Sequence, residues 1–296
     1  MPLSKEKIKK LQFLAKWVRK MILEMGISAG FGHIAPSFSC VEILICLYYG
    51  GILRVKPSNP EWDERDRFLL SKGHAAMALY PILSDLGFFP LSELKGFCRE
   101  KSRLGAHAES NIPGIDISTG SLGHGLSIGA GLALSAKMDK RRFFSFVLMG
   151  DGECNEGSVW EAAMFASHHC LNNLIAIIDR NRLCATDFLE SCLDVEPLDK
   201  KWESFGWEVA IVNGHSFEEL FSVLEKARFR KSAAPLVIIA STTKGKGLPY
   251  MESNPIWHYR IPQDKELEIA KKKLLYVEGK RIKMNMPSAL LRKKNE

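Results

Sequence analysis

The chain has 296 residues, of which 46% are hydrophobic and 25% are charged, a composition typical of globular proteins rather than of disordered or fibrous ones. No apolar stretch reaches the roughly 18 residues of a membrane-spanning helix, and the charged N-terminal segment lacks the apolar core of a signal peptide, so we expect a cytoplasmic protein with no membrane partner. The net charge of +7 comes partly from basic runs near the two ends, which carry no interleaved aromatic residues and therefore do not predict a nucleic-acid-binding surface.

The first part of the chain predicts helices around one short strand. A long helix is expected from residue 5 to residue 26, where Gly26 would end it. Residues 28–39 are interpreted as a loop that leads into an apolar helix over 40–50. Residues 65–87 predict a short strand, a turn and a helix.

The rest of the chain alternates between apolar strands and helices. Residues 119–138 predict a glycine-rich turn that opens a helix of small residues, and further helices are predicted at 156–169 and 216–228. Buried strands rich in Ile, Val and Leu are predicted at 143–150, 173–181, 207–215 and 235–242. This alternation is typical of an α/β fold with a mostly parallel central sheet and helices on both faces. We expect residues 1–275 to form a single domain and residues 276–296 to form a basic, mobile C-terminal tail.

Three polar turns directly follow predicted strands. They are the segments Gly150–Gly152, Asp179–Asn181 and Thr242–Gly247. In parallel α/β sheets, ligands bind at the carboxyl ends of the strands, so we expect the three turns to converge on one edge of the sheet.

The Gly150-Asp151-Gly152 triplet and Asn181 have the chemistry of a magnesium site. A carboxylate, an amide oxygen and a backbone carbonyl are suitable ligands for Mg²⁺, which completes its octahedron with waters and substrate phosphates. The pattern therefore implies a bound diphosphate. A GDG triplet alone is most often only a turn, and the Asn after the next strand makes the pattern much more specific.

This pattern resembles the thiamine diphosphate motif, and its surroundings resemble the N-terminal part of transketolases. The matching segments are RFLLSKGHAAMALY, PGIDISTGSLGHGLSIGAGLAL, GDGECNEGSVWEAAMFA and WHYRIPQD, and the similarity runs from about residue 10 to residue 270. The resemblance implies a thiamine diphosphate-binding fold. It also implies transfer of a two-carbon ketol unit from a ketose or ketose phosphate to an aldose or aldose phosphate.

The resemblance further implies which residues bind the metal and the cofactor. Asp151, Asn181 and the backbone carbonyl of Leu183 would hold Mg²⁺ or another divalent cation such as Ca²⁺ or Mn²⁺. For Lys244, a position facing the cofactor and a position in solvent are equally compatible with the sequence. The other implied cofactor contacts are His74, Gly120, Ser121, Leu122, Gly150, Asp151, Gly152, Asp179, Asn181 and His258.

The implied catalytic group consists of imidazoles and one carboxylate. An imidazole titrates near neutrality, so one side chain can donate a proton in one half-reaction and accept one in the other. Glu156 matches an acidic residue that lies at the dimer interface of transketolases. The histidines that would ring the reacting carbon are His33, His74, His107 and His258.

Several other residues have plainer interpretations. Glu153 is expected to be a helix N-terminal carboxylate, stabilised by the helix dipole. His124 stands where the family usually has Gln, so its role stays open. His168, His169 and His215 match nothing catalytic and are expected on the surface or in loops. The seven cysteines are scattered and form no C-x-x-C pair, which indicates reduced, mostly structural thiols.

Three loops depart from the family pattern. NRLCATDF, residues 181–188, lacks both glycines of the usual NG-x-x-x-DG loop. GFGHIAPSFS and GAHAES keep His33 and His107 but change the residues that follow them. None of these departures removes a proposed metal ligand, so they bear on substrate preference or loop mobility.

The chain also lacks a counterpart of the transketolase domain that binds the aminopyrimidine ring. The resemblance therefore implies the N-terminal subunit of a split transketolase, inactive alone and completed by a C-terminal subunit that carries the pyrimidine-binding domain, in an α2β2 heterotetramer. Two alternatives stay open. One is a specialised carboligase, which forms an acyloin from a 2-oxo acid or uses an unusual sugar acceptor. The other is a non-catalytic cofactor-binding subunit.

Overall fold

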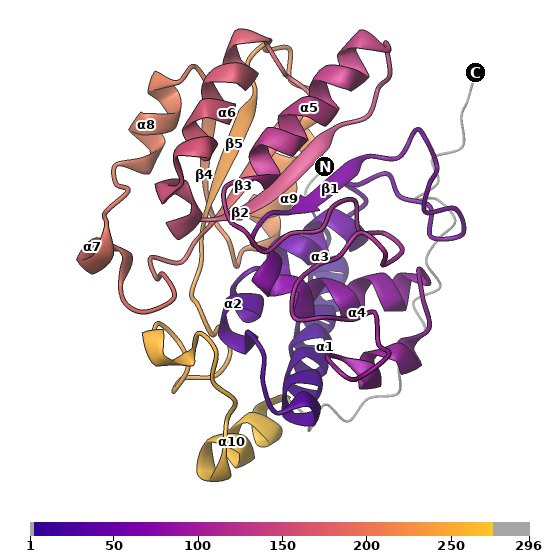
Figure 1. Ribbon diagram of the computed structural model, residues 1–296, viewed down its shortest axis with the longest axis vertical. Helices are drawn as coiled ribbons and strands as arrows, with labels where there is room; N and C mark the ends of the chain where they lie inside the picture. The colour runs from indigo at the N-terminus through magenta and orange to yellow at the C-terminus, as the bar shows by residue number, and fades with distance from the viewer. Residues whose placement is uncertain (1–2, 275–296) are drawn as a thin grey trace.

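A parallel five-stranded sheet forms the centre of the computed structural model, which describes residues 3–274 (Figure 1). The strands pair in the order β1-β2-β3-β5-β4, and every pairing is parallel. The predicted α/β fold is therefore confirmed, and each predicted strand is present. The strands are β1 (Arg67–Leu70), β2 (Ser145–Gly150), β3 (Leu174–Arg180), β4 (Glu208–Asn213) and β5 (Leu236–Ser241).

Helices cover both faces of this sheet, as the alternating pattern predicts. One buried core joins residues of α1, α3, α4 and α9 to one face, and a second core joins residues of α5, α6 and α8 to the other. The helices are α1 (Lys5–Ala29), α2 (Ile34–Ser39), α3 (Val41–Tyr49), α4 (Ala76–Leu86), α5 (Gly125–Met138), α6 (Gly157–His168), α7 (Leu189–Cys192), α8 (Leu198–Ser204), α9 (Phe217–Ala227) and α10 (Asp264–Leu274).

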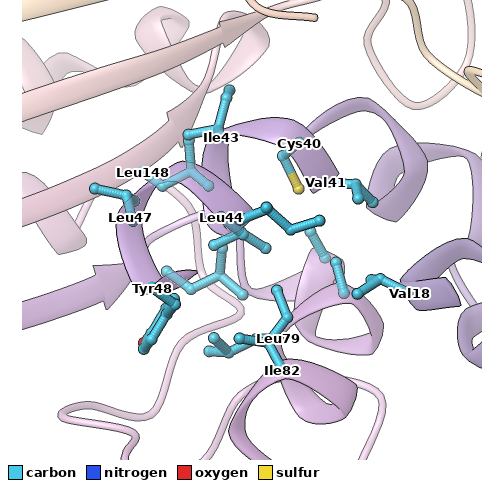
Figure 2. Close-up of a cluster of buried hydrophobic side chains, with 14 of the residues drawn as sticks. Val18, Cys40, Val41, Ile43, Leu44, Leu47, Tyr48, Leu79, Ile82 and Leu148 are labelled. Carbon is cyan, nitrogen blue, oxygen red and sulfur yellow. The ribbon is translucent and has the colours of Figure 1, made fainter. Parts of the chain in front are cut away.

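Successive strand residues enter opposite cores. In β2, Phe146 and Leu148 belong to the core with α3, whereas Val147 and Met149 belong to the core with α5. This is the two-residue period of a pleated strand, and both sets are apolar because both faces are covered. Figure 2 shows Leu148 at the edge of the first core, close to Leu47 of α3.

The first helix continues beyond the predicted end at Gly26. It ends at Ala29, and Gly30 adopts the left-handed φ of 78° and donates its N–H to the Gly26 carbonyl. Gly26 stays inside the helix because α2 packs there: a Cβ at this position would lie 2.8 Å from Cδ1 of Ile34. The glycine is thus a packing residue rather than a stop signal.

Some elements were not predicted from the sequence. The expected loop 28–39 contains α2, whose residues are all buried, and no helix was predicted for α7, α8 or α10. The short helices do not have enough residues to show a 3.6-residue apolar period. The longer helix α10 lies at the periphery. The predicted basic tail, residues 276–296, lies outside the described residues. None of the helices in 3–274 is long and apolar enough to span a membrane.

Candidate active site

The three polar turns meet at the carboxyl edge of the sheet, as predicted. In the pairing register Gly150 of β2 lies opposite Asp179 of β3, and Asp179 lies opposite Ala240 of β5. The turns that begin at Asp151, Asn181 and Thr242 therefore leave the sheet side by side. Neighbouring parallel strands that end at the same level bring the turns together, although the turns lie far apart in the sequence.

Asp151 is a buried carboxylate at the end of β2. It is 2% exposed, and its two oxygens accept hydrogen bonds from the backbone N–H of Gly152, at 2.9 Å, and of Arg182, at 2.5 Å. Burial, together with the nearby charge of Asp179, raises the pKa of Asp151 to about 6. Asp151 makes no ion pair with any residue in 3–274, so a bound cation would supply the missing positive charge.

Asn181 and Leu183 lie beside this carboxylate. The Asn181 Oδ1 atom accepts a hydrogen bond from the Leu183 N–H at 3.1 Å, which holds the two predicted ligands together. No three His, Cys, Asp or Glu side chains within the described part of the chain form a metal cluster. The donor set of one carboxylate, one amide oxygen and one backbone carbonyl fits Mg²⁺ when phosphate oxygens complete its coordination. The residues present therefore fit the predicted metal.

The structure explains how the loop after β3 does without its usual glycines. Arg182 occupies the first of the two positions and has a φ of 62°, so it adopts the left-handed conformation that favours glycine. Asp187 occupies the second position and is not among the residues with a positive φ. An antiparallel bridge between Leu183 and Phe188 closes the loop. The loop therefore keeps a turn geometry despite the changed sequence.

Asp179 does not point into open space at the edge of the sheet. It is fully buried, and its carboxylate accepts hydrogen bonds from the Lys72 ammonium, the Thr242 hydroxyl and, at 2.5 Å, the Ser39 hydroxyl. Burial opposes its charge, but pairing with Lys72 lowers the pKa of Asp179. With both oxygens engaged, Asp179 joins four segments around the site. Lys72, Ser39 and Thr242 were not predicted, because their partners are distant in the sequence.

The four predicted histidines form one cluster. The His33 ring lies 5.5 Å from that of His74, 5.7 Å from that of His107 and 5.3 Å from that of His258, between ring centroids. The His74 and His258 rings are 5.5 Å apart. The four side chains come from different segments of the chain and lie next to one another, and their catalytic role stays a prediction.

Three of these imidazoles, those of His33, His74 and His258, are kept neutral because burial lowers their pKa values. Burial, reinforced by the charges of His107 and Lys244, lowers the pKa of His33 to about 4. Burial and Lys244 lower the pKa of His258 to about 3, and burial also lowers the pKa of His74. Near pH 7, each of these rings has one N–H donor and one nitrogen acceptor, which suits hydrogen bonding to a carbonyl or hydroxyl group.

Lys244 is a buried ammonium without a carboxylate partner in the described residues. Its Nζ atom donates to the Cys184 carbonyl at 2.7 Å and lies 2.9 Å from Nδ1 of His258. Burial lowers the pKa of Lys244 to about 8. A buried cation beside the turns that carry Asp151 and Asn181 is the counterpart that a diphosphate requires. Of the two positions compatible with the sequence, the buried one is correct.

The TGSLG turn passes beside the histidine cluster. A Cβ at Gly120 would lie 3.4 Å from the His107 ring, so this glycine permits the close approach of the two loops. Gly120, Ser121 and His124 help to line a cavity of about 390 Å³ in front of α5. Leu122 is partly buried behind them.

Glu153 lies in the first turn of a short 3₁₀ helix, Gly152–Asn155, in agreement with the predicted helix N-terminal carboxylate, but it also bonds to other segments. It is 2% exposed and accepts hydrogen bonds from the Ser71 hydroxyl, the Gly123 N–H at 2.9 Å and the Gly150 N–H at 3.1 Å. These donors belong to the turns after β1, before α5 and at the end of β2. Glu153 therefore ties three site turns together.

His215 lies in the turn between β4 and α9, as expected for a loop residue, and its ring contacts two other segments. Its Nδ1 atom lies 2.9 Å from the Glu42 carboxylate, and its Nε2 atom accepts the Thr243 N–H at 2.9 Å. Arg19 binds the same carboxylate. His215 therefore connects α3 to the turn that carries Lys244, and the missed signal was a buried glutamate within an otherwise apolar helix.

Glu156 lies at the surface between the GDG turn and α6. Ile128 of α5 and Met164 and Phe165 of α6 are exposed by 40%, 52% and 40%. The two helices pack side by side on one face of the sheet (Figure 1). This apolar face next to Glu156 is available for contact with another chain.

Two aromatic residues beside the histidines were not predicted as site residues. The Tyr259 ring lies 4.6 Å from the His33 ring and is half exposed, and Phe31 lies 6.2 Å from Tyr259. Tyr259 directly follows His258 in the WHYRIPQD segment, so its place beside a predicted site histidine was the available signal.

Comparison with known proteins relates this site to one family. The family described as "Transketolase, thiamine diphosphate binding domain" matches residues 11–290. One subunit of the apulose-4-phosphate transketolase of Phocaeicola vulgatus is 40% identical over 263 residues, which cover 89% of this chain and 93% of the relative. One subunit of the 6-deoxy-6-sulfo-D-fructose transketolase of Clostridium sp. is 40% identical over 249 residues, covering 84% and 90%.

A solved structure supports the same relationship. Transketolase from Campylobacter jejuni has a TM-score of 0.83 and 33% identity, over 89% of this chain but 42% of that chain. This chain therefore spans less than half the length of that protein. The family match over most of the chain, and the similarity to two subunits of comparable length, show that the chain belongs to the transketolase family and corresponds to its thiamine diphosphate-binding domain.

Proposed function

We propose that this chain is the diphosphate-binding subunit of a two-chain transketolase that depends on thiamine diphosphate and a divalent cation. It transfers a two-carbon ketol unit from a ketose, or its phosphate, to an aldose acceptor. The observation that carries this proposal is the juxtaposition of the histidine cluster with the buried Lys244, at the sheet edge that also holds Asp151 and Asn181. The names of the two similar relatives, both subunits of transketolases, support it.

The metal and diphosphate would be held by complementary charges. Asp151, Asn181 and the Leu183 carbonyl bind the cation, and Lys244 faces the phosphate oxygens. Gly150 leaves room there, because a Cβ at this position would meet nothing within 4 Å. Asp179 acts indirectly: it fixes Lys72 and Thr242 rather than contacting the cofactor itself.

The bound cofactor supplies the electron sink for cleavage and formation of the carbon–carbon bond. The chain's own residues hold and move protons around that chemistry. Neutral His33, His74 and His258 donate N–H hydrogen bonds to a substrate carbonyl oxygen and accept hydrogen bonds from sugar hydroxyls. His107, beside Gly120, completes the ring of imidazoles.

The proposal includes a partner chain, because a relative of comparable length is named as one subunit of a transketolase. The exposed apolar residues of α5 and α6, next to Glu156, form the surface that we assign to assembly, and an α2β2 heterotetramer is the expected form. Burial of such a patch provides about 25 cal/mol for each Å² of apolar surface removed from water.

The test is reconstitution. The chain is mixed with a C-terminal subunit that carries the pyrimidine-binding domain, and transfer from a ketose phosphate to an aldose phosphate is followed with thiamine diphosphate and Mg²⁺. Transfer is expected only when both chains and the cofactor are present. An Asp151→Asn variant should lose most activity, whereas Asp139→Asn, at the exposed end of α5, should retain it. Activity of the isolated chain, or activity without cofactor, would refute the proposal.

A specialised carboligase is the second candidate, favoured by Tyr259. The ring of this side chain lies 4.6 Å from that of His33, between centroids, where it could contact an unusual substrate. The loop at Arg182 also departs from the family pattern. A screen of sugar phosphates, unusual sugars and 2-oxo acids as substrates of the reconstituted enzyme separates the two candidates. Reaction with the common pentose and hexose phosphates alone would exclude the specialised role.

A further inference from the structure

Two cysteines lie in contact in the loop that follows β3. The Cys184 and Cys192 sulfur atoms are 3.1 Å apart, and both residues are free thiols. A disulfide bond of about 2.05 Å would therefore require the two sulfurs to approach by only about 1 Å. Cys192 is exposed and Cys184 is partly exposed, so a small oxidant has access to the pair.

Backbone interactions hold the two residues near each other. The Cys184 N–H donates to the Asp187 carbonyl at 3.0 Å, which reverses the chain direction. The Leu189 N–H donates to the Arg182 carbonyl at 2.9 Å, and the single turn of α7 ends at Cys192. The contact between the sulfurs is thus produced by the closed form of the loop, which aligns positions eight residues apart.

We propose that Cys184 and Cys192 are a modification site at which oxidation forms a reversible intramolecular disulfide that closes the loop over residues 184–192. A small-molecule disulfide is the oxidant. The thiolate of one cysteine attacks a sulfur of that disulfide and releases one small thiol. The other cysteine then attacks the mixed disulfide, forms the protein S–S bond and releases the second small thiol. The protein loses two electrons and two protons, and the small disulfide gains them.

The position of the loop gives the bond a structural consequence. The Cys184 carbonyl accepts the Lys244 hydrogen bond, and Cβ of Cys184 lies 3.7 Å from where a Cβ on Gly152 would be. Closing the loop covalently removes conformational freedom from this segment. The bond itself does not depend on the proposed transketolase function, because it follows from the contact between the sulfurs.

Thiol counting and mass spectrometry of the full chain test the proposal. The reduced chain is equilibrated with oxidised and reduced glutathione, quenched with acid and denatured. Titratable thiols should fall from seven to five, and the tryptic peptide 183–200 should lose the mass of two hydrogens. Cys192→Ser should keep six thiols or carry glutathione on Cys184. The matched control Cys170→Ser, which removes an exposed thiol elsewhere, should still lose two thiols.

Hydrogen exchange provides the readout for loop closure. Amides of residues 183–193 should exchange more slowly in the oxidised wild type than in the reduced form, and the redox state should not change their exchange in Cys192→Ser. Seven thiols persisting in oxidising buffer, a bond that maps to other cysteines, or equal exchange in both forms would overturn the proposal.

Discussion

Glu153 illustrates how one buried residue can organise a site. Its carboxylate is the shared acceptor for Ser71, Gly123 and Gly150. Glu153→Ala should lower the free energy of unfolding by about 3 kcal/mol, because unsatisfied buried donors cost about 1–3 kcal/mol each and water can satisfy some of them. Glu153→Gln keeps one acceptor oxygen and should cost about half as much. Urea unfolding measures both values, and a loss below about 1 kcal/mol for the Ala variant would contradict this role.

His33 gives a prediction with a defined pH window. Its folded pKa of about 4 lies below its ordinary value, 6.5, so the unfolded chain binds the proton more readily. The contribution to stability is therefore fully present above pH 6.5 and is lost as the pH falls toward 4. Partial exposure reduces the effect to about 1–2 kcal/mol. In His33→Asn, unfolding curves should show a correspondingly smaller loss of stability between pH 6.5 and pH 4, and an unchanged pH dependence would contradict the pKa.

The limits of sequence reasoning at this scale are set by distance along the chain. Asp151, Asn181 and the four histidines could be predicted because each lies in a local motif with its own spacing. The hydrogen-bond partners of Glu153 and Asp179 could not be predicted, because most of them lie far away along the chain. Lys72, for example, lies 107 residues before Asp179. The sequence alone does not distinguish a buried carboxylate from one on the surface, because the neighbours of each become known only in the folded protein.

At the scale of elements, α5 offers a matched pair of glycines. A Cβ on Gly129 would lie 2.5 Å from Cγ2 of Val147 in β2, whereas a Cβ on Gly131 would meet nothing within 4 Å. Gly129→Ala should destabilise the chain by about 1–3 kcal/mol through overpacking. Gly131→Ala should stabilise it by up to about 1 kcal/mol, because alanine favours the helix. Thermal unfolding of both variants should give shifts of opposite sign, and shifts of the same sign would contradict this packing of α5 on β2.

Long, strongly patterned elements were predictable and short ones were not. The strands β2, β3 and β5 are continuous apolar runs, as expected for strands covered on both faces. In contrast, α2 was predicted as a loop because it has six residues and includes Pro36. The helix α2 forms because it is buried between neighbouring segments, and this burial cannot be predicted from the local sequence. The same tertiary packing explains why α1 continues through Gly26.

At the scale of the whole molecule, the exposed apolar side chains of α6 are the predicted partner surface. Phe165→Asp should weaken association with the C-terminal subunit by at least about tenfold, since placing a charge in a buried apolar contact costs more than about 1.4 kcal/mol. The isolated chain should keep its stability. Phe229→Asp, which changes an exposed Phe beyond the end of α9, is the control and should leave assembly unaffected. Analytical ultracentrifugation of the mixed chains distinguishes these outcomes, and equal effects of both variants would exclude α6 from the interface.

The proposed second chain also concerns the whole molecule. This proposal rests on the domains that the transketolase family has, rather than on a pattern in these residues. The fold, by contrast, follows from the alternation of apolar strands and helices, and relatives of similar extent are named as transketolase subunits. Assembly and substrate choice depend on surfaces and on a partner whose residues are not in this sequence. They therefore stay proposals while the fold and the family are established.

Calorimetric titration of thiamine diphosphate into the assembled subunits, with and without Mg²⁺, tests the central claim most directly. If Asp151 and Asn181 hold the diphosphate through a cation, binding should require Mg²⁺, and Asp151→Asn should weaken it at least about tenfold, equivalent to about 1.4 kcal/mol. Asp139→Asn should bind as the wild type does. Equal affinity with and without the cation, or unchanged affinity in the Asp151→Asn variant, would contradict the assignment of this site.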